Sequence, residues 1–441
     1  MKRTVITPRT LRGFTDVMPS AGRRRRQIIQ VLEDVYNSFG FDPIQTPAVE
    51  YAEILKGQGS TESDKQMFEF EDKGGRQVAL RFDLTVPLAR FVAQHEAELT
   101  FPFRAYNIGY AWRGDRPQRG RYREFLQSDA DIIGASGITA DAEILTVVAT
   151  ALARMDIGPF TIRINNRKIL NGALTRLGLH DRVAPVLRAL DKIDKIGPGA
   201  VADELAEAEV TAAAAADLLA LIGSVQESNE ASLSHVEAVV KGSADGEAGV
   251  AEVREVIGLV SAGLGAPAPI RFDPSIVRGL DYYTGIVLEA VHDEVPEVGS
   301  ITGGGRYDDL ASRFTSSRLP GVGASIGISR ILAALERLGR IGDLGRGRAL
   351  AVITQDQESD RSALMRLAAE IRAAGRFDVE LYPAAVRHAS QMKYGDARGA
   401  RFLLTLDDDG TMSVKDMESG DRASATPADV PALLGKLAGT G

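Results

Sequence analysis

The residues with the clearest chemical potential are arginines crowded into one predicted β-hairpin. The segment YAWRGDRPQRGRYREFLQSDADIIG carries five arginines over positions 113–123 and only one acid, Asp115. Guanidinium groups are always charged and fork-shaped, so they can hold phosphate oxygens in bidentate fashion. Strand alternation places Arg121 on the side of the strand that Gln127 and Asp131 continue. Taken alone, such a hairpin is more often a merely solvated surface, at odds of roughly three to one.

Further segments add polar side chains and shift those odds towards a ligand site. FDLTVPLARF precedes a helix that begins at a proline, VRGLDYYTGIVLE and GGGRYDDLASRF are rich in tyrosine and charge, and LPGVGASIGISRIL is rich in glycine. Glycines let the backbone approach a ligand closely. Each segment is a weak signal, but together they are specific. Their candidate site residues are Asp83, Leu84, Thr85, Arg278, Tyr282, Tyr283, Tyr307 and Arg330.

Several kinds of site are excluded by the sequence. There is no P-loop motif, and the three glycines that precede Arg306 open no βαβ unit of a dinucleotide-binding fold. A nucleophile elbow and a kinase signature are also missing. The chain has no cysteine, and its five histidines are scattered, so we expect no metal site. If the substrate is a nucleotide, the arginines must bind its phosphates.

Length and charge limit the class of protein. At 441 residues the chain is long enough for about three domains. It has no apolar run of about 18 residues, no secretory signal and no cysteine, so we expect a cytoplasmic protein without a membrane span. The net charge of −8 means that any RNA partner must be held by local basic patches.

The predicted elements form an α+β protein. Antiparallel strands are expected over residues 67–82 and 101–133, with more strands near 275–305. An alanine-rich helical insertion, residues 171–265, interrupts a domain that spans residues 1–338. A linker at 339–347 leads to a small α/β domain at 348–441. A helix is expected over 20–39, and its four arginines at 23–26 are interpreted as a solvated face.

In order along the chain, these segments resemble those of the histidyl-tRNA synthetases. FGFDPIQTPAVE is similar to motif 1 of class II synthetases, with Pro47 at the position that supports the dimer interface. YAWRGDRPQRGRYREFLQ resembles motif 2 and GVGASIGISRIL motif 3. RGLDYYTG and GGGRYDDL resemble two segments peculiar to the histidine enzymes. The resemblance implies a class II antiparallel catalytic domain with a helical insertion, and a C-terminal α/β anticodon-binding domain.

The resemblance also implies a reaction and its partners: ATP, with Mg²⁺, activates L-histidine, which is then transferred to the 3′ end of its tRNA by a homodimer. Arg113 would hold the α-phosphate of ATP, Arg330 the γ-phosphate and Arg121 the ATP tail, while Arg278 would act as the catalytic cation. The residues expected around histidine are Asp83, Leu84, Thr85, Gln127, Asp131, Tyr282, Tyr283 and Tyr307. Asp83 replaces a glutamate that many bacterial members carry.

Two alternatives are weighed. One is the non-catalytic, histidine-sensing regulatory subunit of ATP phosphoribosyltransferase, which normally lacks the C-terminal domain and the arginines present here. The other is a class II synthetase for proline or threonine, which would lack RGLDYY and GGGRYD. Residues 348–441 hold 12 basic and 14 acidic residues, so anticodon contact is expected to be local. The expected contact residues are Arg387, Lys393, Arg398 and Tyr394.

Overall fold

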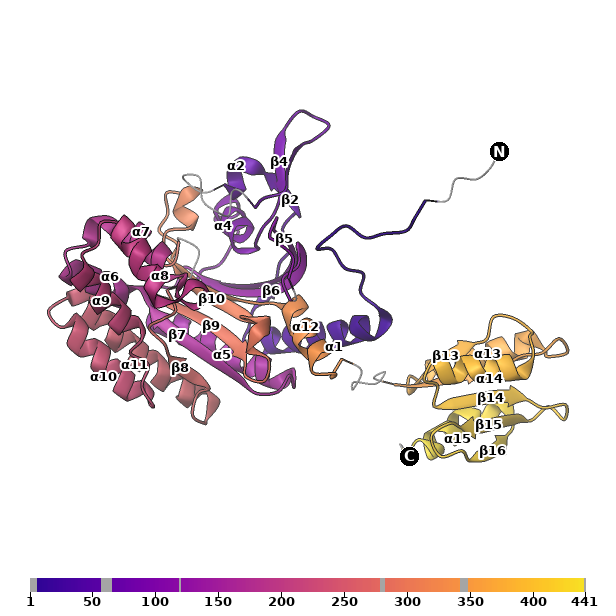
Figure 1. Ribbon diagram of the computed structural model, residues 1–441. Helices are drawn as coiled ribbons and strands as arrows, with labels where there is room; N and C mark the ends of the chain where they lie inside the picture. Colours follow the sequence, from indigo (N-terminus) through magenta and orange to yellow (C-terminus); the bar gives the residue numbers. More distant parts are fainter. Residues whose placement is uncertain (1–5, 57–65, 119, 278–281, 342–347, 440–441) are drawn as a thin grey trace. The chain divides into compact units, whose positions relative to one another are not determined.

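The computed structural model describes residues 6–56, 66–118, 120–277, 282–341 and 348–439, without the side chains of residues 194 and 195. The chain divides into two compact units, residues 1–341 and 342–441 (Figure 1). The first is built on a mainly antiparallel sheet and the second on a mixed sheet with helices, which confirms the α+β class. Within the described residues, no helix combines the length and apolarity that a membrane span requires.

An eight-stranded sheet forms the centre of the first unit. Only its two outermost pairs, β1–β5 and β7–β8, are parallel, and the other neighbouring strands are antiparallel. Strands β5 and β6 form the predicted hairpin, with Phe103 opposite Ile133 and Trp112 opposite Glu124. In spatial order the strands are β1 (Asp42–Pro43), β5 (Phe103–Trp112), β6 (Glu124–Ile133), β11 (Gly321–Ile326), β10 (Thr302–Tyr307), β9 (Ile286–His292), β7 (Phe160–Asn166) and β8 (Ile270–Phe272).

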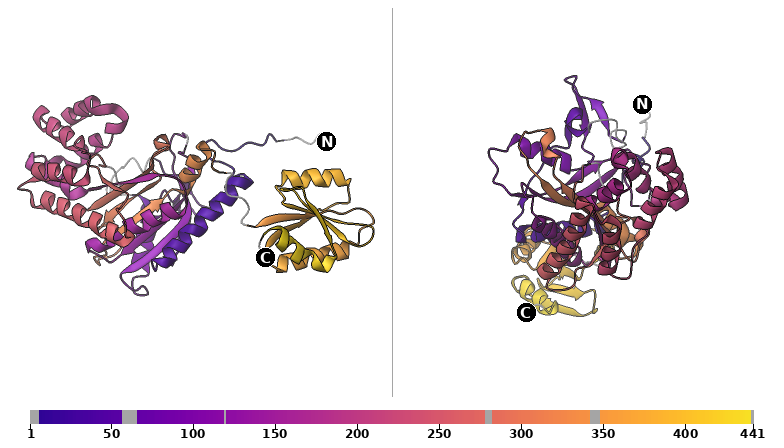
Figure 2. Two further views of the ribbon diagram at one scale, coloured as in Figure 1. Left: turned by 90° about the horizontal axis from the view of Figure 1, so that it is seen from below. Right: turned by 90° about the vertical axis from the view of Figure 1, so that its left-hand side faces the viewer.

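Helices α1 (Pro19–Ser38), α5 (Ile138–Arg154) and α12 (Ile328–Arg337) cover one face of this sheet (Figures 1 and 2). The β6 side chains that pack into the core beneath them are Leu126, Ala130 and Ile132. Because side chains alternate along a strand, the odd-numbered residues of β6 face the other way. The helix-free side of β6 therefore presents polar side chains.

The arginine run of α1 is partly structural. Arg24 is only 5% exposed, and its guanidinium donates a 3.1 Å hydrogen bond to the Met155 carbonyl just beyond α5. Helix ends leave such carbonyls without helical partners, and positive charge is favourable there. Arg25 donates a 2.7 Å hydrogen bond to the Tyr110 hydroxyl. The prediction of a solvated face for residues 23–26 is therefore wrong for these two arginines.

A three-stranded antiparallel sheet packs with two helices around a second core. Its strands, in spatial order, are β2 (Val49–Tyr51), β4 (Gln77–Leu80) and β3 (Glu69–Glu71). The helices are α2 (Ala52–Leu55) and α4 (Thr85–Gln94). The core includes Leu55, Val86 and Leu88, and it also receives Tyr307 from the large sheet. This packing brings the start of α4 close to the polar face of β6.

A helical segment lies between β7 and β8. Side chains cap several of its helices: Thr211, Ser228 and Ser243 accept hydrogen bonds from backbone N–H groups of the first turns. Gly265, in the left-handed region at φ 64°, ends the last helix. The elements are α6 (Arg167–Arg176), η1 (His180–Arg182), α7 (Val183–Leu190), α8 (Ile193–Glu207), α9 (Ala212–Ile222), α10 (Asn229–Val240) and α11 (Ala244–Leu264). Helix thus begins four residues before the expected insertion.

The second unit alternates strands and helices. Strands β12, β13 and β14 pair in parallel, and β15 and β16 continue the sheet in antiparallel fashion. Leu364, Leu367 and Ile371, which share one face of α13, pack on β12 and β14. In spatial order the strands are β13 (Phe377–Leu381), β12 (Ala349–Ile353), β14 (Phe402–Leu406), β15 (Met412–Asp416) and β16 (Arg422–Ala425). The helices are α13 (Arg361–Ala373), α14 (His388–Ala397) and α15 (Val430–Leu437).

Candidate active site

A pocket of about 510 Å³ lies on the polar face of the large sheet. It is lined from β6, β9, β10 and β11 and from the starts of α4 and α12. Eight of the predicted site residues line it: Asp83, Thr85, Arg113, Arg121, Gln127, Tyr282, Tyr283 and Arg330. Sequence segments more than 200 residues apart therefore meet in one cavity.

The remaining predicted site residues have other positions. Asp131 and Tyr307, each 3% exposed, form a buried hydrogen-bonded pair close to the pocket. Leu84, at 1% exposure, immediately precedes α4 and is not among the residues that line the pocket. Arg278 lies outside the described residues, so its predicted role stays a prediction.

The three described arginines of the pocket are held by backbone or acidic partners. Arg113 donates a 2.9 Å hydrogen bond to the Phe82 carbonyl, and its guanidinium carbon lies 5.1 Å from the centre of the Phe125 ring. Arg330 donates to the carbonyls of Ser300 and Gly120. These contacts fix the direction of each guanidinium while it borders the pocket, and such fixed positive groups suit a polyphosphate.

Arg121 has a different partner. Its Nε donates a 2.8 Å hydrogen bond to Oδ2 of Asp115, which is buried and lines the same pocket. The Arg121 side chain is 46% exposed, so this ion pair contributes little to stability. The pair instead sets the direction of a cation at the pocket rim.

Buried acids make up another part of the wall. Gln127, Asp129 and Asp131 alternate along the polar face of β6, and Asp83 joins them from the start of α4. Oδ1 of Asp83 accepts a 3.1 Å hydrogen bond from the Val86 N–H. Its Oδ2 is buried and has no hydrogen-bond partner among the described residues. An unpartnered buried carboxylate oxygen favours a ligand that brings a donor or a positive charge.

Burial alters the protonation of these acids. Loss of solvent raises the pKa of Asp83 from its ordinary value near 3.8 to about 6. It raises the pKa of Asp131 to about 7, against the hydrogen bond from Tyr307, which lowers it. Burial and the charge of Asp131 also raise the pKa of Asp129. A cationic ligand would favour the ionised forms of all three.

Two tyrosines, Tyr282 and Tyr283, line the pocket, and a third, Tyr307, packs against Tyr282. The ring centres of Tyr282 and Tyr283 lie 4.9 Å apart, and those of Tyr282 and Tyr307 lie 5.9 Å apart, both edge-to-face. Burial raises the pKa of all three hydroxyls, so they remain protonated at neutral pH and can donate hydrogen bonds. The hydroxyl of Tyr307 donates to Asp131.

Two glycines of β11 let these side chains lie against the sheet. A Cβ at Gly323 would lie 1.8 Å from Oδ1 of Asp131, and one at Gly321 would lie 2.3 Å from Cε2 of Tyr307. Real Cβ atoms do not approach other atoms so closely, so both positions require glycine. The glycine-rich segment therefore makes room for recognition side chains, rather than for a phosphate as in a P-loop.

A family model described as histidyl-tRNA synthetase matches residues 13–331, which is more than half of the chain. The chain belongs to the histidyl-tRNA synthetase family.

Individual relatives of the family agree along nearly the whole chain. The chain is 45% identical over 396 residues to a histidine–tRNA ligase of Rhodopirellula baltica, which covers 90% of this chain and 89% of the relative. It is 41% identical over 443 residues to that of Wolinella succinogenes, covering 98% and 100%. A crystal structure of histidyl-tRNA synthetase from Nostoc sp. PCC 7120 matches with a TM-score of 0.84 at 30% identity, over 98% of this chain and 100% of that one.

Another structural match concerns the fold alone. A protein of Bacillus halodurans, described as an ATP phosphoribosyltransferase regulatory subunit/histidyl-tRNA synthetase, matches with a TM-score of 0.74 at 22% identity. It covers 89% of this chain and 97% of that one. The fold therefore does not separate a histidine ligase from a regulatory subunit, whereas the sequence identity to the ligases favours the ligase.

Sequence reasoning missed four acids that line the pocket of this synthetase-family chain. Asp115 was noted only as the single acid of the hairpin, Asp129 only as a member of the β6 alternation, and Asp191 and Glu289 not at all. Glu289 accepts a 3.0 Å hydrogen bond from Arg163. The alternation itself was a usable signal for Asp129, because it lies two residues from both Gln127 and Asp131. Glu289 is in an apolar strand where nothing in the sequence distinguishes it.

Proposed function

We propose that the chain is a histidine–tRNA ligase. It activates L-histidine with ATP to form histidyl-adenylate and pyrophosphate, and it then transfers the histidyl group to the 3′-terminal ribose of histidine tRNA. The relatives named histidine–tRNA ligase, at 45% and 41% identity over nearly the whole chain, favour this reading over the regulatory subunit.

The observation that carries the proposal is the composition of a single pocket. Three arginines, buried acids and tyrosines all border the same cavity. Activation brings a carboxylate and a triphosphate together, two anions that repel each other. Arginines with fixed directions offset this repulsion and stabilise the charge that grows at the α-phosphate. Positioning and electrostatics therefore suffice, and no covalent enzyme intermediate is needed.

The arginines are assigned by position. Arg113 would bind the α-phosphate, Arg330 the γ-phosphate and Arg121 the ATP tail. Arg121 would then exchange its contact with Asp115 for one with the nucleotide. Arg278, which lies outside the described residues, would act as the catalytic cation at the α-phosphate.

The acids and tyrosines are assigned to histidine. Asp83, Thr85 and Gln127 would meet its α-ammonium group, since Asp83 offers a buried oxygen without a partner. Asp131, Tyr283 and Tyr307 would meet the imidazole, whose two nitrogens can each form a hydrogen bond. A site built to bond both nitrogens rejects apolar analogues by roughly 10⁴-fold.

We propose that ATP enters as its magnesium complex, with the metal bound by the phosphates. Magnesium commonly binds this way, through substrate phosphates and one or two carboxylates rather than a protein cage. The described residues contain no group of three His, Asp or Glu side chains placed to hold a metal ion. In this proposal the protein contributes arginines, and the metal is part of the substrate.

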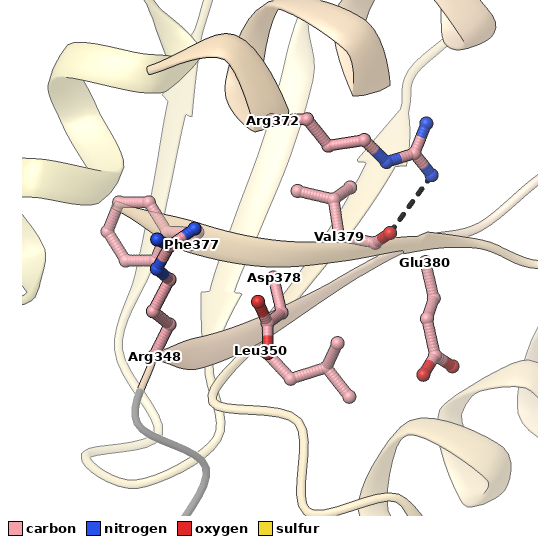
Figure 3. Close-up of a pocket in the computed structure, with 7 residues that line it drawn as sticks. All are labelled: Arg348, Leu350, Arg372, Phe377, Asp378, Val379 and Glu380. Carbon is pink, nitrogen blue, oxygen red and sulfur yellow. Dashed lines mark hydrogen bonds between the residues drawn. The ribbon is translucent and has the colours of Figure 1, made fainter. Parts of the chain in front are cut away.

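Anticodon recognition is assigned to the second unit. Its pocket of about 370 Å³ is bordered by Arg348 and Arg372 but also by Asp378 and Glu380, so it has no net positive charge (Figure 3). Glu380 also accepts hydrogen bonds from Tyr394, at 2.7 Å, and from Arg398.

Arg398 and Tyr394 are thus already engaged with an acid, which weakens their case as RNA contacts. Arg387, which precedes α14, and Lys393 within it are exposed. These two cations are therefore the better candidates of the four for contact with RNA, together with the start of α14.

A homodimer is proposed from the face of the small sheet. Val49, Tyr51 and Phe70 are 42%, 48% and 44% exposed, and Tyr51 and Phe70 both pair with Val78 of β4. They therefore share one face, because directly paired residues point the same way. Exposed apolar side chains gathered on one face favour a protein partner. This face includes part of the segment that resembles motif 1.

The proposed reaction with tRNA implies a cytoplasmic location.

The test is histidine-dependent exchange of pyrophosphate into ATP, followed by aminoacylation of tRNA. The purified chain should exchange label only with L-histidine, and it should charge histidine tRNA but not proline or threonine tRNA. Exchange with proline or threonine would assign the chain to another class II synthetase. Binding of histidine without any exchange would favour a regulatory subunit.

A further inference from the structure

Asp129 is a buried acid of the pocket for which neither the family resemblance nor the proposed reaction supplies a role. It is 3% exposed, lines the pocket and lies between Gln127 and Asp131 on the polar face of β6. Its neighbour across the sheet is Ser325 of β11, which also lowers the pKa of Asp129. Such a costly buried carboxyl calls for a physical explanation.

The contacts of Asp129 determine how Gln127 is turned. Nε2 of Gln127 donates to both carboxyl oxygens of Asp129, at 2.9 and 3.1 Å. An amide nitrogen only donates and an amide oxygen only accepts, so the reverse orientation would set two acceptors against each other. Burial raises the pKa of Asp129, but the nearby Arg81 guanidinium and the positive charge of a bound ammonium favour its ionised form. An ionised carboxyl can only accept, so it fixes the amide orientation.

The fixed amide leaves Oε1 of Gln127 for the substrate. Gln127 lines the pocket, and its Oε1 receives no hydrogen bond from the described residues. The buried Oδ2 of Asp83 also lacks a partner in the described part of the chain. An α-ammonium group has three N–H donors and no acceptor, so it requires acceptors of this kind. A reversed Gln127 would instead point its own N–H groups at that cation.

Resting on the ligase function proposed above, we propose that Asp129 is a positioning residue: it holds the Gln127 amide so that Oε1 accepts a hydrogen bond from the α-ammonium of histidine. Asp129 acts through Gln127 rather than on the substrate. The buried guanidinium of Arg81, which interacts electrostatically with both Asp129 and Asp83, offsets part of the negative charge. Asp129 thus contributes to the selection of an α-amino acid over other imidazole compounds.

A double-mutant cycle tests the dependence on Gln127. Asp129→Ala and Gln127→Ala should each raise the KM for histidine in ATP–pyrophosphate exchange about 10- to 100-fold, as expected for loss of a hydrogen bond to a charged group. The KM for ATP should change less than about 3-fold. Because both changes remove one and the same interaction, the double variant should resemble Gln127→Ala alone within about 3-fold.

A ligand comparison tests the dependence on the ammonium. The affinity for imidazole-4-propionate, which is histidine without its α-amino group, should be nearly equal in wild type and Asp129→Ala. Ser128→Ala is the matched control, since Ser128 is equally buried on the same strand but faces α1, where it bonds to the Tyr36 hydroxyl. This control should leave the KM for histidine unchanged.

The outcomes are separable. If the KM effects of the two single variants multiply in the double variant, Asp129 contacts the substrate itself. If Asp129→Ala lowers the affinity for histidine and for imidazole-4-propionate equally, its role is structural. Either result overturns the inference while the wild-type protein still performs histidine-dependent exchange. If the wild type shows no such exchange, the proposed function fails instead.

Discussion

The hydroxyl of Tyr307, on β10, donates a 2.5 Å hydrogen bond to Oδ1 of Asp131, on β6, although β11 lies between those two strands. The two side chains meet above the intervening strand at Gly321 and Gly323, which pair with Tyr307 and Asp131 respectively. A hydrogen bond that spans a whole strand holds both polar groups at one height above the sheet. In the proposed function, this pair would meet the imidazole of histidine, which has two nitrogens.

Tyr307→Phe removes this hydrogen bond and keeps the ring. We expect the KM for histidine in ATP–pyrophosphate exchange to rise about 10-fold, because Asp131 loses its orienting donor, while the KM for ATP stays unchanged. Tyr110→Phe is the matched control, since the Tyr110 hydroxyl accepts from Arg25 outside the pocket. Equal effects on both substrates would place Tyr307 outside the histidine subsite.

Asp83→Asn should separate stability from activity. The pKa of Asp83 is about 6 in the folded chain, against an ordinary value of 3.8. Its protonated form therefore stabilises the folded state below about pH 4, and this stabilisation is lost as the pH rises through 6. The asparagine retains the oxygen that caps Val86 and cannot ionise. Thermal unfolding of the ligand-free variant should indicate a gain of roughly 1–3 kcal/mol at pH 8 and little change at pH 4.

The same variant should bind histidine more weakly, because it lacks the charge that meets the ammonium. A variant with unchanged pH dependence of the melting temperature would contradict the burial of an ionisable Asp83. A variant with unchanged histidine affinity would remove Asp83 from the subsite.

Arg113→Ala should lower kcat for adenylate formation by about 10²- to 10³-fold, as expected when one fixed donor to a developing anion is removed. Single-turnover formation of adenylate is the direct measurement. Arg104→Ala serves as the control, because Arg104 lies on β5, which ends just before Arg113, but forms an ion pair with Glu143 at 2.7 Å, outside the pocket. If both variants lose activity alike, the effect is one of folding.

Tyr51→Asp should weaken self-association. A carboxylate placed on the face that carries Val49 and Phe70 would have to be buried on assembly, which is costly without a partner. Sedimentation velocity should show a dimer for the wild type and a shift to monomer for the variant. Met365→Asp, at a side chain 56% exposed in the second unit, should leave the dimer intact. A wild type that is monomeric at micromolar concentration would contradict the proposal.

Arg387→Glu combined with Lys393→Glu should raise the KM for tRNA without affecting ATP–pyrophosphate exchange. Both cations are exposed on α14 or just before it, and each lost phosphate contact lowers affinity in a salt-dependent way. Aminoacylation at two salt concentrations gives the measurement. Arg366→Glu, whose side chain is 67% exposed on α13, provides the comparison. Identical tRNA kinetics in all three proteins would place the RNA contact elsewhere.

Much of the fold followed from local patterns. The β5–β6 hairpin and α1 lie where alternation and helical periodicity placed them. The burial of Arg24 could not be predicted from local patterns, because it depends on a contact with Met155, which is 131 residues away in the sequence. A run of charges carries no information about which member meets a distant helix end.

Most residues of the candidate site, but not all, could be named from the sequence. Motif positions brought most of the assigned residues to one pocket, since spacing within each motif fixes which face a side chain takes. Glu289 was missed because an acid in a buried strand is recognisable only once its partner Arg163 is in view. Asp131 and Tyr307 were named, but their mutual hydrogen bond depends on a strand order that the sequence does not state.

The bare surface of β11 restricts how the substrate repertoire of this pocket can be changed. Enlarging a binding cavity usually means trimming a side chain, but Gly321 and Gly323 offer nothing to trim, and any addition there would collide with Tyr307 or Asp131. Along β11, room for a bulkier amino acid must then come from shortening Tyr307 or Asp131. Those are the groups that would recognise the imidazole ring in the proposed function. A change that admits a bulkier amino acid at β11 would therefore also weaken recognition of histidine.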